Sequence, residues 1–199
     1  MNRKMQQIIE IAGTPSSGKT SLCNYIARRL RETEISMHVS IAGMDSTPTI
    51  IPKTIYQYDI WQSCELAQLL LETGFKDDEK VTILDRGIFD QICWLDRFVN
   101  DRSMSAKERL VSERFTSSPT LYKNIDYVLI LLTSNHDVAI SRGKNPNGLV
   151  GEDTHRILLD AYNNRFSEFR LPAEKFRKFH IETDTLSRSE TAEKFWCWM

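Results

Sequence analysis

The chain has 199 residues, of which 41% are hydrophobic and 27% are charged, and its formal net charge is −1. This length and composition predict one soluble globular domain and exclude a disordered chain. The near-neutral charge supplies no field that would attract nucleic acid, so a nucleic-acid partner is not expected. No apolar run approaches the roughly 20 residues of a membrane span. The start of the chain does not read as a signal peptide, and four widely spaced cysteines fit free thiols, so we expect a cytoplasmic protein.

Short apolar segments alternate with segments of helical periodicity along most of the chain. The predicted strands span residues 8–12, 37–42, 81–84, 125–132 and 178–182. The predicted helices span residues 19–30, 56–72, 88–100, 106–115, 135–141, 154–169 and 189–198. Parallel strands need crossovers, which helices supply. The pattern therefore predicts an α/β protein: an open three-layer sandwich with about five parallel strands, in a single domain over residues 1–199.

Residues 13–20 read Gly-Thr-Pro-Ser-Ser-Gly-Lys-Thr and form a complete Walker A loop between a predicted strand and a predicted helix. Gly13 and Gly18 permit a tight turn in which backbone N–H groups surround phosphates, and the helix N-terminus favours the anion. Lys19 is expected to reach the β- and γ-phosphates of ATP, and the Thr20 hydroxyl to bind Mg²⁺. The remaining residues predicted to bind the nucleotide in this loop are Ser16, Ser17 and Ser21.

Asp85 and Arg86 follow the predicted strand at residues 81–84. In open α/β sheets, ligands bind at the carboxyl ends of the strands. A carboxylate there can hold Mg²⁺ or accept a proton from an attacking hydroxyl, and an adjacent guanidinium can bind an anionic substrate. The alternative is an exposed turn with an ion pair.

A Walker A loop combined with a strand-terminal Asp-Arg pair resembles the P-loop nucleoside and nucleotide kinases, the thymidylate-kinase-like group. The extended segment at residues 83–90 also resembles uncharacterised bacterial kinase-like NTPases. The resemblance covers the order of elements across most of the chain. It implies a P-loop NTPase fold with a helical lid, ATP as donor, and a nucleoside or nucleoside monophosphate as acceptor. It also implies that Asp85 lies beside the metal and the acceptor and that Arg86 contacts the acceptor.

Two features depart from the pattern of thymidylate kinases. The residue before the first loop glycine is usually acidic in that group, but here it is Ala12. Glu10 points to the same face of the strand but lies deeper, and no role is transferred to it. The loop also reads Thr-Pro-Ser-Ser between its glycines, which argues against carrying over thymidine monophosphate as the acceptor.

Residues 141–170 form the candidate lid, because they are too polar and too long for a plain connection. Small-molecule P-loop kinases close a segment with arginines over the transferring group and so exclude water. Arg142 is the first candidate for a cation that stabilises the transition state, and Arg156 is the second, with Lys144 nearby. With Lys19 and the Asp-Arg pair, Arg142 completes the predicted catalytic set. The alternative is a solvated charged helix.

The acceptor pocket is expected after the second strand. Its candidate residues are Pro48, Pro52, Lys53, Tyr56, Tyr58, Trp61 and Gln62. Aromatic rings can stack on a base, and Lys53 can bind a phosphate. Phe89 and Asp90 are further candidates, whereas Tyr58 and Trp61 could instead belong to the helix core.

Two other functions stay open at this point. A regulatory ATPase or switch acting with a protein partner also needs a Walker A loop, although no Asn-Lys-x-Asp pattern favours a GTPase. A kinase of a non-nucleotide metabolite is the third reading. A kinase needs a small acceptor for turnover, whereas an ATPase does not. The sequence leaves a homodimer open.

Overall fold

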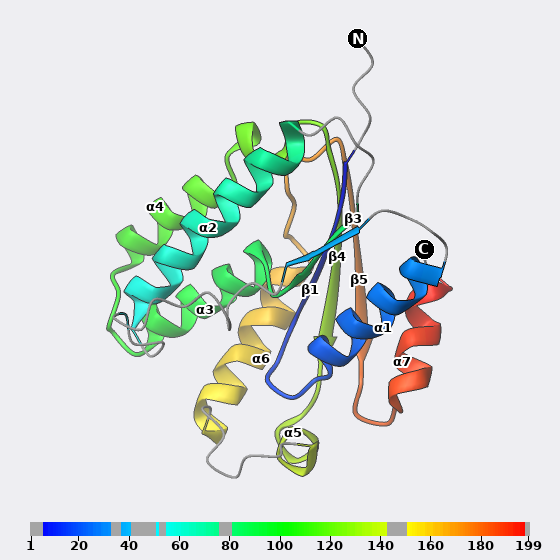
Figure 1. The fold of residues 1–199 in the computed structure, drawn as a ribbon. Helices are drawn as coiled ribbons and strands as arrows, with labels where there is room; N and C mark the ends of the chain where they lie inside the picture. Colours follow the sequence, from blue (N-terminus) through cyan, green and yellow to red (C-terminus); the bar gives the residue numbers. More distant parts are fainter. Residues whose placement is uncertain are drawn as a thin grey trace.

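The computed structural model describes residues 6–32, 37–40, 51, 55–75, 81–142 and 151–197, with the backbone alone for 37–40. It confirms the predicted three-layer sandwich around a parallel sheet (Figure 1). The strands are β1 (Gln6–Gly13), β2 (Met37–Ser40), β3 (Val81–Asp85), β4 (Ile125–Thr133) and β5 (Lys175–Glu182). Strands β3 and β4 consist mainly of β-branched and leucine residues, as expected of strands that are covered on both faces.

The sheet has the strand order β2-β3-β1-β4-β5, and every pairing is parallel. The register pairs Ile11 of β1 with Asp85 of β3, and Gly13 of β1 with Leu132 of β4. The end of β1 therefore lies between the carboxyl ends of its two neighbours. In parallel sheets this edge collects the loops that bind ligands.

Helices cover both faces of the sheet. They are α1 (Lys19–Glu32), α2 (Tyr56–Phe75), α3 (Ile88–Asn100), α4 (Ala106–Thr116), α5 (His136–Arg142), α6 (Glu152–Phe166) and α7 (Arg188–Trp196). Helices α1 and α7 pack on one face, and α2, α3 and α6 lie on the other, with α4 outside them (Figure 1). None of the helices described is both long and apolar enough to cross a membrane.

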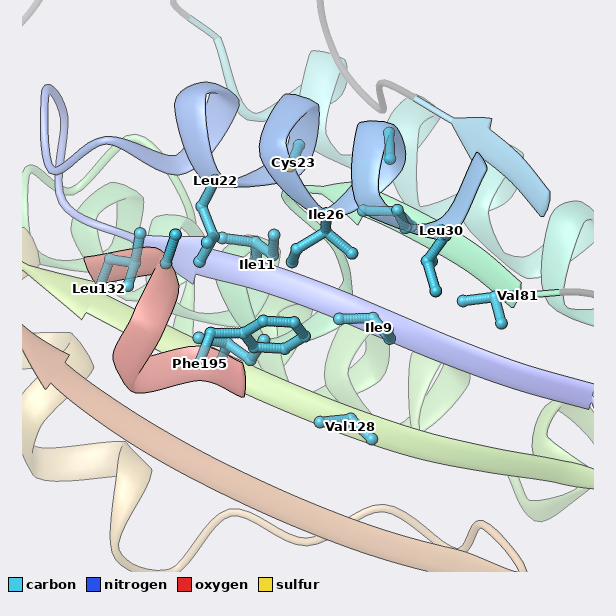
Figure 2. Packing of buried hydrophobic residues seen from close by; sticks show 14 of the residues in the cluster. Ile9, Ile11, Leu22, Cys23, Ile26, Leu30, Val81, Val128, Leu132 and Phe195 are labelled. Atoms are coloured by element: carbon cyan, nitrogen blue, oxygen red, sulfur yellow. The ribbon is translucent and has the colours of Figure 1, made fainter. Parts of the chain in front are cut away.

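The face under α1 and α7 has a continuous apolar core (Figure 2). Helix α1 places Leu22, Ile26 and Leu30 at helical spacing against Ile9 and Ile11 of β1. Phe195 of α7 packs into the same cluster with an exposed fraction of 1%. Phe195 thus closes the core on this face of the sheet.

The opposite face of β1 receives Ile8, Glu10 and Ala12, because side chains alternate along a strand. Ile8 and Ala12 join apolar clusters formed with α2, α3 and α6. Glu10 is fully buried between them and faces the start of α3. A charged group in this position needs partners, and α3 and β4 provide them.

The predicted element boundaries differ from the observed ones by a few residues. Helix α6 begins at Glu152 and ends at Phe166, whereas residues 154–169 were expected to be helical. A 3₁₀ helix at Pro119–Tyr122 was not predicted. Helix α6 is also more than a polar cover, because His155, Leu158 and Tyr162 are buried on its inner side. The second half of the candidate lid is therefore packed against α3.

Candidate functional site

The Walker A residues form a loop that closes on Lys19. Its Nζ donates hydrogen bonds of 2.8 Å to the carbonyl oxygens of Gly13 and Thr14. Gly13 and Gly18 have φ values of 145° and 98°, which side chains rarely allow. Burial, followed by the charge of Arg86, lowers the pKa of Lys19 to about 8. The ammonium group thus lies inside the loop, where a bound anion would favour its charged form and raise its pKa.

The first two residues of the loop are held from both sides. The Gly13 N–H donates to Oδ1 of Asp90 over 3.2 Å, and the Thr14 N–H donates to the carbonyl oxygen of Leu132 over 3.1 Å. The Thr14 hydroxyl also lies 3.3 Å from that of Ser134, just beyond β4. Because helix α3 and strand β4 each contribute a contact, the loop is attached to two elements of the core.

The other predicted nucleotide-binding residues differ in exposure. Ser16 is exposed and has a φ of 58°, while Ser21 is half-buried. The Ser17 hydroxyl is buried and has no hydrogen-bond partner among the residues that the structure describes. A buried hydroxyl without a partner is costly, and a phosphate oxygen would satisfy it. This loop therefore fits a phosphate chain.

Asp85 lies beside the Walker A helix. The Thr20 hydroxyl donates a hydrogen bond of 2.5 Å to Oδ2 of Asp85. Hydroxyl and carboxylate oxygens are the hard ligands that Mg²⁺ prefers, and the ion commonly takes its remaining ligands from phosphates and water. The described residues include no cluster of three or more His, Cys, Asp or Glu side chains that could hold a metal. Thr20 and Asp85 fit a cation that is shared with a nucleotide.

Arg86 adopts a left-handed backbone conformation, with φ at 73°, and its N–H donates to the carbonyl oxygen of Ile11 over 3.0 Å. Such a conformation costs a side-chain-bearing residue roughly 1–3 kcal/mol, and it is concentrated at functional sites. The guanidinium lies 3.7 Å from Oδ2 of Asp90 and 5.6 Å from the ring centre of Trp94. Arg86 is thus held at the edge of the sheet with part of its side chain exposed.

Glu10 is a residue of this region to which the sequence analysis gave no role. Its carboxylate accepts hydrogen bonds from the N–H groups of Phe89 and Asp90, at 3.3 and 3.1 Å, and from the Tyr127 hydroxyl at 2.6 Å. Burial raises its pKa to about 7, against the effect of these hydrogen bonds. Helix α3 has no side-chain cap of its own, since Gly87 precedes it. Glu10 therefore caps α3 from the neighbouring strand.

Gly87 leaves the room that this cap requires. A Cβ atom at Gly87 would lie 2.7 Å from Cδ of Glu10. Any side chain there would displace the carboxylate from the helix N-terminus. The only sequence signal for this arrangement was a charged residue inside an apolar strand.

A second buried polar group lies where α2 meets α3. The Ser63 hydroxyl donates to Oε1 of Gln91 over 2.6 Å, and both side chains are buried. Asp59, one turn earlier on α2, is also buried. Burial and the charge of Asp90 raise the pKa of Asp59 to about 7, while Arg86 opposes this shift. Asp59 and Gln91 are thus polar candidates near the Asp-Arg pair that the sequence analysis missed.

The candidate lid cations do not contact the Walker A loop in this structure. Arg142 donates to the hydroxyl of Thr183 over 3.0 Å and to carbonyl oxygens of Thr183 and Leu186, in the turn between β5 and α7. Arg156 is exposed and pairs with Asp153 over 3.0 Å. Their proposed action on the transferring group stays a prediction.

Several candidates for the acceptor pocket can be compared with the structure. Tyr58 is buried and lies 6.0 Å from the half-buried ring of Trp61, so the helix-core alternative describes Tyr58. Gln62 donates to the Tyr58 hydroxyl. Tyr56 packs near Phe98.

The two further candidates, on α3, lie in different places. Phe89 is in the core beside α6, while Asp90 faces the Walker A loop. Pro48, Pro52, Lys53 and Lys144 lie outside the described residues.

No protein-family model matches the sequence, and no curated protein matches it. Solved structures match the fold. A deoxyadenosine kinase from M. mycoides, with the products dCMP and a flexible dCDP bound, has a TM-score of 0.71 at 17% identity, and the match covers 96% of this chain and 97% of that chain. The form with dATP bound has a TM-score of 0.62 at 17% identity and covers 98% of both chains.

A thymidylate kinase from Candida albicans matches with a TM-score of 0.60 at 15% identity, over 98% of this chain and 91% of that chain. The similarity thus extends over nearly the whole chain, beyond the Walker A loop. The chain has the fold of the P-loop nucleoside and nucleotide kinases.

Proposed function

We propose that this protein is a kinase that transfers the γ-phosphoryl group of ATP to a nucleoside or a nucleoside monophosphate. The observation that carries the proposal is the 2.5 Å contact between the Thr20 hydroxyl and Oδ2 of Asp85. It brings the metal-binding position of the Walker A loop together with the carboxyl end of β3. A phosphate loop and an acceptor-side Asp-Arg pair then share one edge of the sheet.

The donor side of the proposal rests on the Walker A loop. Lys19 leaves the carbonyl oxygens of Gly13 and Thr14 and binds the β- and γ-phosphates, while the unpartnered Ser17 hydroxyl and loop N–H groups bind phosphate oxygens. Thr20 and Asp85 would hold Mg²⁺, which would supply positive charge against the phosphates.

The chemical step is an in-line displacement. A bond forms between the acceptor oxygen and the γ-phosphorus as the bond from that phosphorus to the β–γ bridging oxygen breaks, which releases ADP. With a nucleoside acceptor, the hydroxyl proton passes to the carboxylate of Asp85. With a monophosphate acceptor, the attacking phosphate oxygen is already deprotonated. In both cases the main task of the chain is to position the reactants.

The acceptor side rests on Arg86 and its neighbours. A guanidinium can bind a phosphate or hydroxyl oxygen of the acceptor through parallel N–H groups. The ring of Trp94 and the carboxylate of Asp90 hold Arg86 in position. Asp59 and Gln91 offer polar groups for a base or a sugar. The deoxyadenosine kinase that shares this fold has been solved with dATP bound and with the product dCMP bound, which supports a nucleoside or nucleotide acceptor.

The test is ADP release from ATP and Mg²⁺, measured with and without a panel of nucleosides and nucleoside monophosphates, and with mass spectrometry of the acceptor. Stimulation by a panel member together with its phosphorylated form supports the proposal. Lys19→Met is the inactive control. Steady ADP release that ignores every acceptor contradicts the proposal and favours an ATPase or switch. Phosphorylation of a sugar or carboxylic acid alone favours a metabolite kinase.

A further inference from the structure

Asp90 contacts three parts of the site at once. Its Oδ1 accepts the Gly13 N–H at 3.2 Å and the Tyr162 hydroxyl at 2.6 Å, and its Oδ2 lies 3.7 Å from Nη1 of Arg86. Asp90 is buried, with an exposed fraction of 1%. A buried carboxylate requires such compensation, so these contacts constrain one another.

The three partners belong to different functional regions. Gly13 opens the phosphate loop, Arg86 follows β3 on the acceptor side, and Tyr162 lies on α6 within the candidate lid. We propose that Asp90 is a positioning residue, which couples the position of helix α6 to the phosphate loop and to Arg86 through its bond with Tyr162. This inference rests on the proposed kinase function.

The Asp90–Tyr162 bond is not needed merely to attach α6 to α3. The same two helices are joined further along by Asp96 and Arg165, whose Nη2 donates to Oδ1 of Asp96 over 2.8 Å. The rings of Phe89 and Tyr162 also pack with their centres 5.9 Å apart. The Tyr162 hydroxyl links α6 to the phosphate loop as well, because it donates to Oδ1 of Asp90, the oxygen that also accepts the Gly13 N–H. A shift of α6 therefore changes the carboxylate that holds both Gly13 and Arg86.

The chain offers a matched pair of variants. Tyr162→Phe keeps the packed ring and removes only the hydroxyl, and Asp90→Asn keeps an Oδ1 acceptor and removes the charge facing Arg86. Asp96→Asn weakens the second link between the same helices and leaves every contact of Asp90 in place. Thermal melting of each variant verifies folding and measures the stability that each link provides.

Two readouts separate positioning from stability. The first is the ¹⁹F resonance of Trp94 in protein labelled with 5-fluorotryptophan and assigned with Trp94→Phe, because Trp94 contacts Arg86. The second is the acceptor KM compared with the Kd of ADP. In Tyr162→Phe and Asp90→Asn, we expect the Trp94 resonance to move and the acceptor KM to rise about tenfold, with the Kd of ADP changing less. In Asp96→Asn, we expect a lower melting temperature alone.

The proposal fails if Tyr162→Phe and Asp90→Asn leave the Trp94 resonance and the acceptor KM unchanged, or if Asp96→Asn changes them equally. A wild-type protein without acceptor-dependent turnover would instead overturn the proposed function. In that case the Trp94 resonance still tests the coupling, since it requires no reaction.

Discussion

The Thr20 hydroxyl donates to Oδ2 of Asp85 over 2.5 Å, which joins the first turn of α1 to the last residue of β3. The two residues are 65 positions apart in the sequence. Their contact places the metal-binding hydroxyl of a Walker A loop beside the only acidic residue of β3. Each oxygen is a suitable ligand for Mg²⁺, so the pair is the first place to test the site.

We expect Thr20→Val to lower phosphotransfer at least tenfold and to shift the Mg²⁺ requirement to higher concentration, because valine keeps the shape but lacks the oxygen ligand. Thr20→Ser retains the hydroxyl and is the matched control, with activity near that of the wild type. The measurement is initial rate against Mg²⁺ concentration. An unchanged Mg²⁺ dependence in Thr20→Val would remove Thr20 from the metal site.

Nucleotide binding should take up protons near pH 8. The pKa of Lys19 is about 8 in the free protein, and bound phosphates favour its charged form. The complex then holds more protons than the free protein, so affinity falls as pH rises through 8. Calorimetry of ADP binding in two buffers with different ionisation enthalpies measures this uptake. Lys19→Met should remove it, and equal uptake in both proteins would assign the proton to another group.

Glu10 should make stability depend on pH below neutrality. Its folded pKa of about 7 exceeds the ordinary value of 4.5. Between these values the folded chain keeps a proton that the unfolded chain loses, so the free energy of unfolding falls as pH rises. Across this window the free energy of unfolding falls by about 3 kcal/mol. The edges of the window lie at the two pKa values.

Glu10→Gln isolates that contribution. Urea unfolding of both proteins at pH 4.5 and 7.5 gives the difference in their free energies of unfolding at each pH. We expect the difference to move in favour of Glu10→Gln as pH rises. Parallel curves for the two proteins would show that Glu10 does not titrate in this window.

We expect Arg86→Ala to raise the acceptor KM strongly while the Kd of ADP stays within a few-fold of the wild type, because the guanidinium lies on the acceptor side. Arg86→Lys should recover only part of the loss, since an ammonium cannot make two parallel hydrogen bonds. Arg114→Ala removes an exposed cation from α4 and serves as the control. A change confined to ADP affinity would contradict the acceptor role.

Periodicity was sufficient to predict the sheet and the helices that flank it. The run at Ile125–Thr133 is apolar except for Asp126 and Thr133, and the structure buries every residue of it except Asp126. The Walker A loop was recognisable because it needs only eight consecutive residues and the strand and helix beside them. Asp85 was also recognisable from the local sequence, because it comes at the end of a predicted strand.

The network around Asp90 could not be predicted in this way. The bond from the Asp90 N–H to Glu10 joins residues 80 positions apart and depends on the register of β1 against β3 and on the approach of α3. Arg142 is a similar case, because its partners lie in the turn between β5 and α7. Such contacts follow from tertiary packing, and no local pattern in one sequence encodes them.

Gly13 lies so close to β4 that a Cβ atom there would be 1.8 Å from the carbonyl oxygen of Leu132. A substitution at Gly13 would push the central strands apart, and the cell would degrade the unfolded product. Lys19→Met, in contrast, should leave a folded and inactive protein. Cells with Lys19→Met would lose the reaction but keep the folded protein, whereas cells with the Gly13 substitution would lose both. Comparing the two would therefore show which effects come from losing the reaction and which from losing the protein.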